Sequence, residues 1–169
     1  MRHREPRFCP FCGVPLEWRP VTPAGERRPA CPQCNYVYWW QPKVAAGTIP
    51  VLDGKVVLVR RGIEPSYGLW VFPGGYVGQG ETLVAAAIRE TREEARVDVT
   101  IERLIDVYSY PDSDVVVAVY EARVVGGRPE AGDECLELAL FTPDRIPWDE
   151  LAFPSTRDAL RDWLRLRQV

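Results

Sequence analysis

GGYVGQGETLVAAAIRETREEARV, residues 74–97, contains both a turn and a helix signal. It begins as a glycine-rich turn and continues as an alanine-rich segment in which Leu83, Ala86 and Ala87 follow helical spacing. We therefore expect a helix that starts near residues 81–82 and packs its apolar side against a sheet. Glycines in the turn would let the backbone approach other groups closely, because they carry no Cβ. These glycines are Gly74, Gly75, Gly78 and Gly80.

The acidic residues of this helix gather on one side. Each helical residue turns by about 100°, so the side chains of Glu90, Glu93 and Glu94 fall within an arc of about 100°. Like charges at this spacing repel one another, and a hard divalent cation such as Mg²⁺ or Mn²⁺ would reverse the sign of that interaction. Arg89 can pair with Glu93 one turn away, and the helix dipole favours Glu81 near the N-terminus. The pattern predicts a metal site, and the alternative is an ordinary solvated helix rich in glutamate.

Strand signals lie on both sides of this stretch. Residues 44–59 are rich in Val and Ile with Asp53-Gly54 in the middle, which predicts a hairpin. Residues 115–125 and 136–141 suggest a second strand pair. A last helix is expected to open at Pro154-Ser155, with Ser155 as its N-cap. Strands mixed with two well-separated helices predict an α/β layered domain with a mixed sheet.

The composition limits the class of protein. A chain of 169 residues with 46% hydrophobic and 27% charged residues fits a soluble protein with one domain and a small appendage. The formal charge of −3 favours neither a nucleic-acid partner nor a membrane surface, although residues 1–40 carry +3 and residues 41–169 carry −6. The start, MRHREPRF, lacks the apolar core of a secretory signal, and no stretch approaches the roughly 18–20 apolar residues of a membrane span. We therefore expect a cytoplasmic protein.

Four of the five cysteines have the spacing of a metal site. Cys9 and Cys12 form one CxxC pair, eighteen residues separate it from the next, and Cys31 and Cys34 form the second. This spacing is a zinc-ribbon signature, and four thiolates leave Zn²⁺ no open position, which indicates a structural ion. Gly13 suits the left-handed backbone that closes such a knuckle. We expect a zinc ribbon over residues 1–40 and a main domain over residues 41–169; two disulfides or four free thiols are the alternative.

With these features assembled, the chain resembles a known family, the Nudix hydrolases. Gly75, five residues, Glu81, seven residues, then Arg89-Glu90-Thr91-Arg92-Glu93-Glu94 and Val97 resemble the Nudix box GX5EX7REUXEEXGU. All charged positions fit. Thr91 stands where an aliphatic residue is usual, and Arg96 replaces the final glycine, which helps the chain leave the helix. The resemblance implies a Nudix α/β/α sandwich with a mixed sheet, preceded by the ribbon.

Further segments resemble one branch of the family, the zinc-ribbon enzymes akin to plant FAD and ADP-ribose pyrophosphatases. These segments are QPKV at 41–44, IEPSYGLWVFPGGYV at 63–77 and LALFTPDRIPWDELAFPSTRDAL at 138–160. The related NADH pyrophosphatases carry an SQPWPFPxS motif after the box, and residues 98–125 contain nothing like it.

The resemblance also implies roles for individual residues. The carboxylates of Glu90, Glu93 and Glu94 and the carbonyl of Gly75 would bind catalytic Mg²⁺ or Mn²⁺. Arg89 would orient the glutamates and Glu81 would support the site. Family members often take one further acid from a loop past the box as general base or metal ligand. Glu134 is the candidate for that acid, with Glu137 second.

The reaction implied is hydrolysis of a diphosphate linkage in a nucleoside diphosphate joined to another moiety. The metal ions would neutralise the diphosphate and lower the pKa of a bound water. ADP-ribose and FAD are the favoured substrates, and both would release AMP. Gly74 and Gly75 would lie against the phosphates, and Tyr67 or Trp70 could stack on adenine, although aromatic residues near a strand end are more often core.

Other readings stay open. One is a zinc-ribbon nucleic-acid-binding protein on a degenerate Nudix scaffold, and another is a Nudix enzyme acting on NADH, capped RNA or oxidised nucleotides. Related pyrophosphatases are often dimers, which makes a second copy of the chain a candidate partner.

Overall fold

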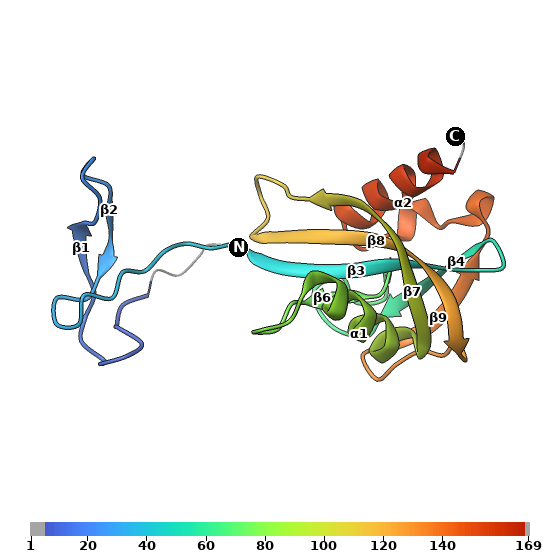
Figure 1. Cartoon of the computed structure of the whole chain (residues 1–169), viewed down its shortest axis with the longest axis horizontal. Coiled ribbons are helices and arrows are strands. Elements are labelled where there is room, and N and C mark those ends of the chain that lie inside the picture. The colour runs from blue at the N-terminus through green and yellow to red at the C-terminus, as the bar shows by residue number, and fades with distance from the viewer. Residues whose placement is uncertain (1–5, 168–169) are drawn as a thin grey trace. The chain divides into compact units, whose positions relative to one another are not determined.

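The computed structural model describes residues 6–167, which form two compact units that meet along the chain between Gln41 and Pro42 (Figure 1). Residues 1–5 and 168–169 lie outside the described residues. They include most of the MRHREPRF start and the last two positions of the predicted main domain. Each unit is described below by itself.

The first unit is a small hairpin with two cysteine-bearing turns. Strands β1 (Glu17–Pro20) and β2 (Arg27–Ala30) pair antiparallel, and β1 is exposed along its whole length. Its buried residues, among those described, are Cys9, Pro29, Ala30 and Cys31. Gly13 has φ 72°, the left-handed conformation predicted for it. So small a core supplies little hydrophobic stabilisation, and a unit of this size usually needs a metal or cross-links.

The second unit is built on one mixed sheet of seven strands. The order is β5-β4-β3-β8-β7, with β6 paired to β3 and β9 paired to β4. The β3–β8 pair is parallel and the other pairs are antiparallel. The strands are β3 (Lys43–Leu52), β4 (Lys55–Arg61), β5 (Trp70–Val71), β6 (Gly74–Tyr76), β7 (Val97–Tyr108), β8 (Val115–Gly127) and β9 (Cys135–Phe141). The helices are α1 (Leu83–Ala95) and α2 (Pro154–Leu166), with 3₁₀ turns at Pro143–Arg145 and Trp148–Glu150.

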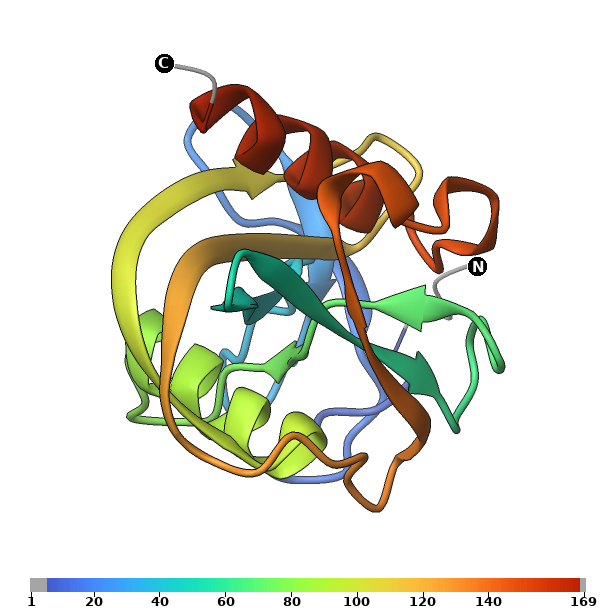
Figure 2. The same cartoon turned by 90° about the vertical axis from the view of Figure 1, so that its right-hand side faces the viewer.

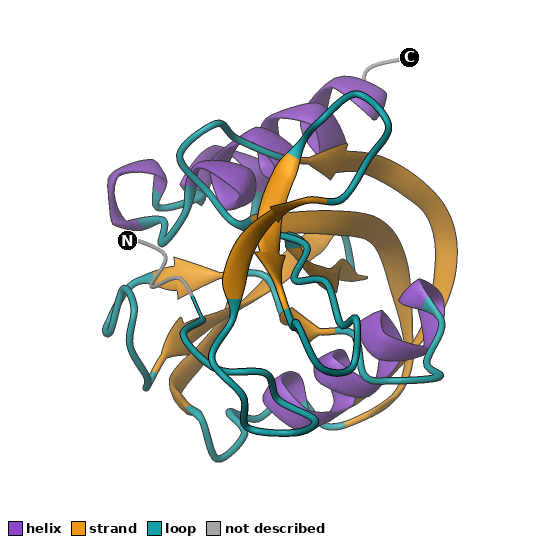
Figure 3. Cartoon of the chain, turned by 90° about the vertical axis from the view of Figure 1, so that its left-hand side faces the viewer, coloured by secondary structure: helices purple, strands orange, loops and turns teal. Residues whose placement is uncertain are grey.

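The two helices cover opposite faces of the sheet, as Figures 2 and 3 show. Strand β4 alternates between them: Val56 and Leu58 pack with Trp163 of α2, whereas Val57 and Val59 pack on the α1 side with Ala95. This period-2 alternation lets one strand contribute to two cores. The predicted α/β layered fold with a mixed sheet is confirmed.

The hairpin predicted around Asp53-Gly54 joins β3 to β4. Asp53 and Gly54 have φ of 48° and 77°, the paired left-handed conformations of a type I′ turn. The predicted two-residue hairpin turn is therefore confirmed.

Two local predictions are wrong. The strands at Val115–Gly127 and Cys135–Phe141 exist, but β8 pairs with β3 and β7, whereas β9 pairs with β4. The segment between them runs past the C-terminal end of α1, and β9 then pairs with β4, on the opposite side of β3 from β8. The last helix begins at Pro154 with Phe153 as its N-cap, so Ser155 lies inside the first turn. Proline at the first helical position explains the shift, since its missing N–H needs no partner there.

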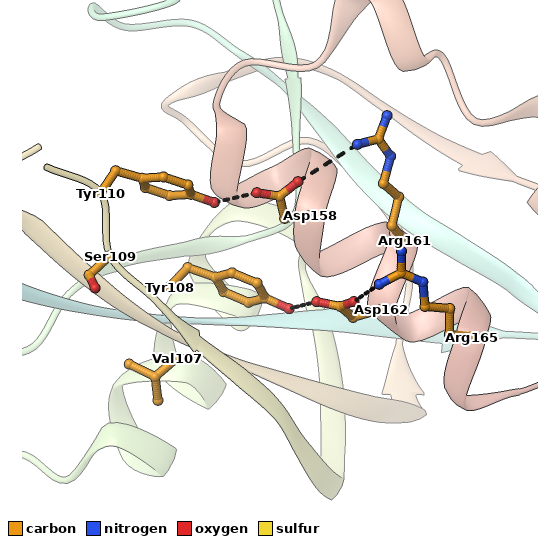
Figure 4. A pocket seen from close by; sticks show the side chains of 8 residues that line it. All are labelled: Val107, Tyr108, Ser109, Tyr110, Asp158, Arg161, Asp162 and Arg165. Atoms are coloured by element: carbon orange, nitrogen blue, oxygen red, sulfur yellow. Dashed lines mark hydrogen bonds and ion pairs between the residues drawn. The ribbon is translucent and has the colours of Figure 1, made fainter. Parts of the chain in front are cut away.

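Helix α2 is tied to the end of β7 by two parallel hydrogen bonds, shown in Figure 4. Tyr108 Oη donates to Asp162 at 2.9 Å and Tyr110 Oη donates to Asp158 at 2.7 Å. These groups line a polar hollow in which each tyrosine hydroxyl already has a carboxylate partner. Within residues 6–167, no helix combines the length and apolar character that crossing a membrane requires.

Candidate active site

The turn from β6 into α1 ends in a side-chain cap at Thr82. The Thr82 side chain accepts a hydrogen bond from the backbone N–H of Ala85 at 3.1 Å, which satisfies one of the free donors at the helix start. Gly80, two residues earlier, has φ 79°. The helix predicted to start near residues 81–82 begins at Leu83.

The glycines before this turn permit close approach of the backbone to α1. A Cβ on Gly75 would lie 2.5 Å from the Glu90 carboxylate, and a Cβ on Gly74 would lie 2.7 Å from Gly47 Cα. Both distances are shorter than a Cβ can tolerate. Residue 74 must therefore be glycine for β6 to pack against β3, whereas a Cβ at residue 75 would displace the Glu90 carboxylate.

Arg89 organises the charged face of α1. Its Nε and Nη2 donate to the two oxygens of Glu81 at 2.8 and 3.0 Å. Its Nη1 donates to Glu90 at 2.7 Å and to Glu93 at 3.0 Å, the pairing that helical spacing predicts. Its Nη2 also donates to the Tyr76 carbonyl at 3.2 Å, which links the helix to β6. One guanidinium thus fixes three carboxylates and the loop beside them.

Glu81 connects this arrangement to the glycine turn. Its Oε2 accepts from the backbone N–H of Gly78 at 2.9 Å. Donation from Arg89, with the Gly78 N–H, holds the pKa of Glu81 at about 2. Glu81 therefore stays ionised and anchors both the guanidinium and the turn.

Glu94 is the most enclosed of the candidate metal ligands. Its Oε2 accepts from the Gly74 backbone N–H at 2.9 Å. Burial raises its pKa to about 7, and the charges of Glu90 and Glu134 push in the same direction. Burial likewise raises the pKa of Glu90 against the opposing effect of Arg89. Crowded carboxylates of this kind gain from a divalent cation, because its charge offsets both the burial and the repulsion.

The two candidates for the additional acid lie in different surroundings. The charge of Glu134 contributes, after burial and closer groups, to the raised pKa of both Glu90 and Glu94. Glu137 lies on β9 and pairs with Arg60 at 3.4 Å, and Arg60 also contacts Glu150. Glu134 therefore stays the first candidate for the additional acid, and Glu137 the second.

The aromatic candidates divide into buried and exposed rings. Trp70 is 6% exposed and lies in the core, edge-on to Phe141 and with Arg60 over its ring. It has no free face for a base, contrary to the substrate contact predicted for it. Tyr67 and Tyr76 are 57% and 54% exposed. Lys43, which the sequence reasoning missed, places its ammonium 5.0 Å from the Tyr76 ring centroid. Only the β3–β6 register brings these two residues together, so local sequence carries no signal for it.

The donor set on α1 fits a hard divalent cation. Three carboxylates lie on one helix face beside the Gly75 backbone, and carboxylate and carbonyl oxygens are the ligands that Mg²⁺ and Mn²⁺ prefer. Their present partners differ: Arg89 binds Glu90 and Glu93, whereas the Gly74 N–H binds Glu94. Among the described residues, their oxygens do not all lie within 4.8 Å of one another, as the cysteine sulfurs of the first unit do.

The four cysteines of the first unit converge on one point. Within residues 6–167, the sulfurs of Cys9, Cys12, Cys31 and Cys34 form the group of metal-ligand atoms that all lie within 4.8 Å of one another. The Cys34 N–H donates to Cys31 Sγ, and this contact lowers the pKa of Cys31 to about 6. Four closely spaced sulfurs match a tetrahedral Zn²⁺ site, and the lowered pKa of Cys31 favours the thiolate form that binds zinc.

The second unit, which carries the α1 glutamates, matches a known protein family. A family model described as the NUDIX domain matches residues 41–164. The ADP-ribose pyrophosphatase of Methanocaldococcus jannaschii is 34% identical over 135 residues, which cover 78% of this chain and 78% of that protein. The NAD-capped RNA hydrolase NudC of Stutzerimonas stutzeri is 29% identical over 162 residues, 95% of this chain but only 55% of that protein. A crystal structure of a NUDIX hydrolase from Nitrosomonas europaea superposes with a TM-score of 0.88 and 37% identity, covering 96% of this chain and 92% of that one.

Proposed function

This chain belongs to the Nudix family of hydrolases, and on that premise we propose that it hydrolyses the diphosphate linkage of ADP-ribose, releasing AMP and ribose 5-phosphate. FAD, which would yield AMP and FMN, is the second substrate of the same class. The observation that carries the proposal is the contact of Arg89 with three glutamates beside the glycine turn. The relative named ADP-ribose pyrophosphatase, which aligns over most of both chains, favours ADP-ribose.

The residues of the chain have distinct parts in this reaction. Glu90, Glu93 and Glu94, with the Gly75 carbonyl, would hold Mg²⁺ or Mn²⁺. A bound ion of this kind neutralises diphosphate charge and activates water. Arg89 orients Glu90 and Glu93 through its Nη1, so the carboxylates need little reorganisation when substrate binds.

Two further features concern the substrate and the remaining acid. The exposed rings of Tyr67 and Tyr76 are available to stack on a base, and Lys43 beside Tyr76 adds a cation that attracts phosphate. Glu134, whose charge contributes to the raised pKa of Glu90 and Glu94, would serve as general base or as a further ligand.

A substrate panel tests the proposal. Zinc-loaded wild type is assayed with Mg²⁺ on ADP-ribose, FAD, NADH and oxidised nucleotides, ranked by kcat/KM. We expect ADP-ribose or FAD to rank first and Glu93→Gln to lower kcat/KM by roughly 100-fold or more, since one ligand charge is lost. Glu102→Gln, an exposed glutamate on β7, is the matched control and should retain activity. Equal activity in wild type and Glu93→Gln, or none in either across the panel, would refute the proposal.

A second candidate is hydrolysis of NAD-capped RNA, favoured by the similarity to NudC. The first unit presents exposed aromatic side chains that could stack on unpaired bases: Phe8, Phe11 and Trp18. A short NAD-capped RNA is therefore added to the panel. A higher kcat/KM on capped RNA than on ADP-ribose would favour this candidate, whereas salt-sensitive RNA binding without turnover of any substrate would favour the nucleic-acid-binding alternative.

A further inference from the structure

The segment between β8 and β9, residues 128–134, lies against the C-terminal end of α1. The backbone N–H of Glu130 donates to the Ala95 carbonyl at 3.2 Å, and that of Gly132 donates to the Glu94 carbonyl at 2.9 Å. A helix leaves its last carbonyls without partners inside the helix, so this loop supplies the missing donors. The loop is thereby attached to the same turn of α1 that carries Glu93 and Glu94.

Gly132 is the point of closest approach. A Cβ at this position would lie 2.0 Å from the Glu93 carbonyl oxygen and 3.0 Å from the Glu93 carbonyl carbon. Both are helix backbone atoms, which cannot move aside as a side chain can. Gly126, six residues earlier, differs: its Cβ would meet Asp98 Oδ2 at 3.3 Å, the end of a flexible side chain. A methyl group at residue 132 would therefore lift the loop from the helix, whereas one at residue 126 would be accommodated.

An ion pair adds to this contact. Arg96 ends α1 in the left-handed conformation with φ 57°, at the position where the family motif has glycine. Its Nη2 binds Asp133 Oδ1 at 2.9 Å. The pair is exposed, so its contribution to stability is small, but it orients the residue directly before Glu134.

The other end of the loop is fixed to β4. The Glu134 carbonyl accepts from the Gly62 N–H at 2.8 Å, and Cys135 then pairs with Arg61. Glu134 therefore lies between two attachments, the α1 end on one side and the β4 end on the other.

Building on the proposed function, we propose that Gly132 is a positioning residue: its close contact with α1 places the Glu134 carboxylate beside Glu90 and Glu94. Glu134 then contributes its charge to binding of the divalent cation. Any side chain at residue 132 should displace Glu134 and so have the same consequence as removing its charge.

A double-mutant cycle tests this inference. Mn²⁺ affinity and kcat are measured for zinc-loaded wild type, Gly132→Ala, Glu134→Gln and the double variant, with Gly126→Ala as control. Loss of one nearby charge should weaken Mn²⁺ binding by roughly 10-fold. We expect Gly132→Ala to weaken it similarly, the double variant to be no weaker than Glu134→Gln, and the control to match wild type. If Gly132→Ala weakens Mn²⁺ binding by the same factor in the wild type and in Glu134→Gln, the glycine acts independently of that acid. The inference is then overturned.

A second variant covers the case in which Gly132→Ala does not fold. Insertion of one glycine after Asp133 keeps the contact of residue 132 with α1 but lengthens the connection to Glu134. It should weaken Mn²⁺ binding as Glu134→Gln does, and unchanged affinity would overturn the inference. The Mn²⁺ measurement needs no substrate. A wild type that hydrolyses none of the substrates would therefore refute the proposed function, while the Mn²⁺ affinities would still test the role of Gly132.

Discussion

The hydroxyl oxygens of Thr48 and Thr91 lie 2.6 Å apart in the fully buried contact between β3 and α1. Thr91 also donates to the Ala87 carbonyl one turn earlier, at 2.7 Å, so Thr48 is the donor to Thr91. Thr91 stands where the Nudix motif usually has an aliphatic residue. The threonine at this position is explained by its partner on β3, because its hydroxyl accepts the hydrogen bond of the buried Thr48 hydroxyl.

The first prediction concerns this pair. Thr91→Val keeps the shape of the side chain but leaves the Thr48 hydroxyl buried without an acceptor, which should cost about 1–3 kcal/mol of unfolding free energy. The double variant Thr48→Val with Thr91→Val removes both polar groups and should recover most of that loss. Urea denaturation at equal zinc content measures both. A double variant as unstable as Thr91→Val would contradict the pairing.

The second prediction concerns Arg89. Lysine keeps the charge but has one ammonium, which cannot reach Glu81, Glu90 and Glu93 together as the planar guanidinium does. We expect Arg89→Lys to lower kcat/KM by about 10–100-fold, the usual effect of losing a partner that orients metal ligands. Arg92→Lys is the matched control on the same helix, since Arg92 is largely exposed and has only a 3.5 Å contact with Asp98. Equal losses in the two variants would show that the contacts of Arg89 do not matter.

Features encoded by neighbouring residues were predictable from the sequence. The start of α1 follows from Thr82 and the apolar spacing after it, and the turn at Asp53-Gly54 needs only those two residues. The spacing of residues 89–94 likewise predicted that Arg89 pairs with Glu93 on the acidic side of the helix. Each of these signals lies within a few residues of the element that it specifies.

Features that depend on distant contacts were not predictable. No strand was predicted over β7, because the apolar alternation of Val97, Val99 and Ile101 ends at residues 102–103, where the pairing with β8 also shifts register. Burial of Trp70 depends on Phe141, more than 70 residues away along the chain. The contact of Gly132 with α1 likewise has no local signature, because it arises from two backbones that approach in space.

The third prediction is a pH dependence. The pKa of Glu81 is about 2 in the folded protein, against an ordinary value of 4.5. The unfolded chain therefore binds more protons at acidic pH, so the stabilisation from Glu81 is complete above about pH 4.5 and is lost as the pH falls towards 2. Glu81→Gln should be less stable than wild type at pH 6, and the difference should shrink by pH 3. Urea midpoints at both values measure it; loss of zinc from the ribbon in acid is common to both proteins and cancels. A difference that is constant with pH would contradict the assignment.

The fourth prediction concerns the cysteine cluster. Sulfurs that approach to 3.5 Å in the pairs Cys9–Cys34 and Cys12–Cys31 should hold one Zn²⁺ per chain. Because the first unit has little buried apolar surface, metal binding should supply most of its folding free energy, about 10–16 kcal/mol in zinc-finger peptides at neutral pH. Cys31→Ser should therefore lose zinc and the structure of the first unit, while the seven-stranded unit keeps its own cooperative unfolding transition.

The fifth cysteine provides the control for that experiment. Cys135 lies on β9, packs against the core beside α1 and is not a member of the four-sulfur group, so Cys135→Ser should keep one Zn²⁺ per chain. Metal analysis after gel filtration, with Co²⁺ substitution to record the thiolate absorption, separates the two variants. Full zinc content in Cys31→Ser would show that the four sulfurs are not one site. Loss of zinc without loss of structure in the first unit would instead show that the hairpin is stable without the ion, against the expectation from its small core.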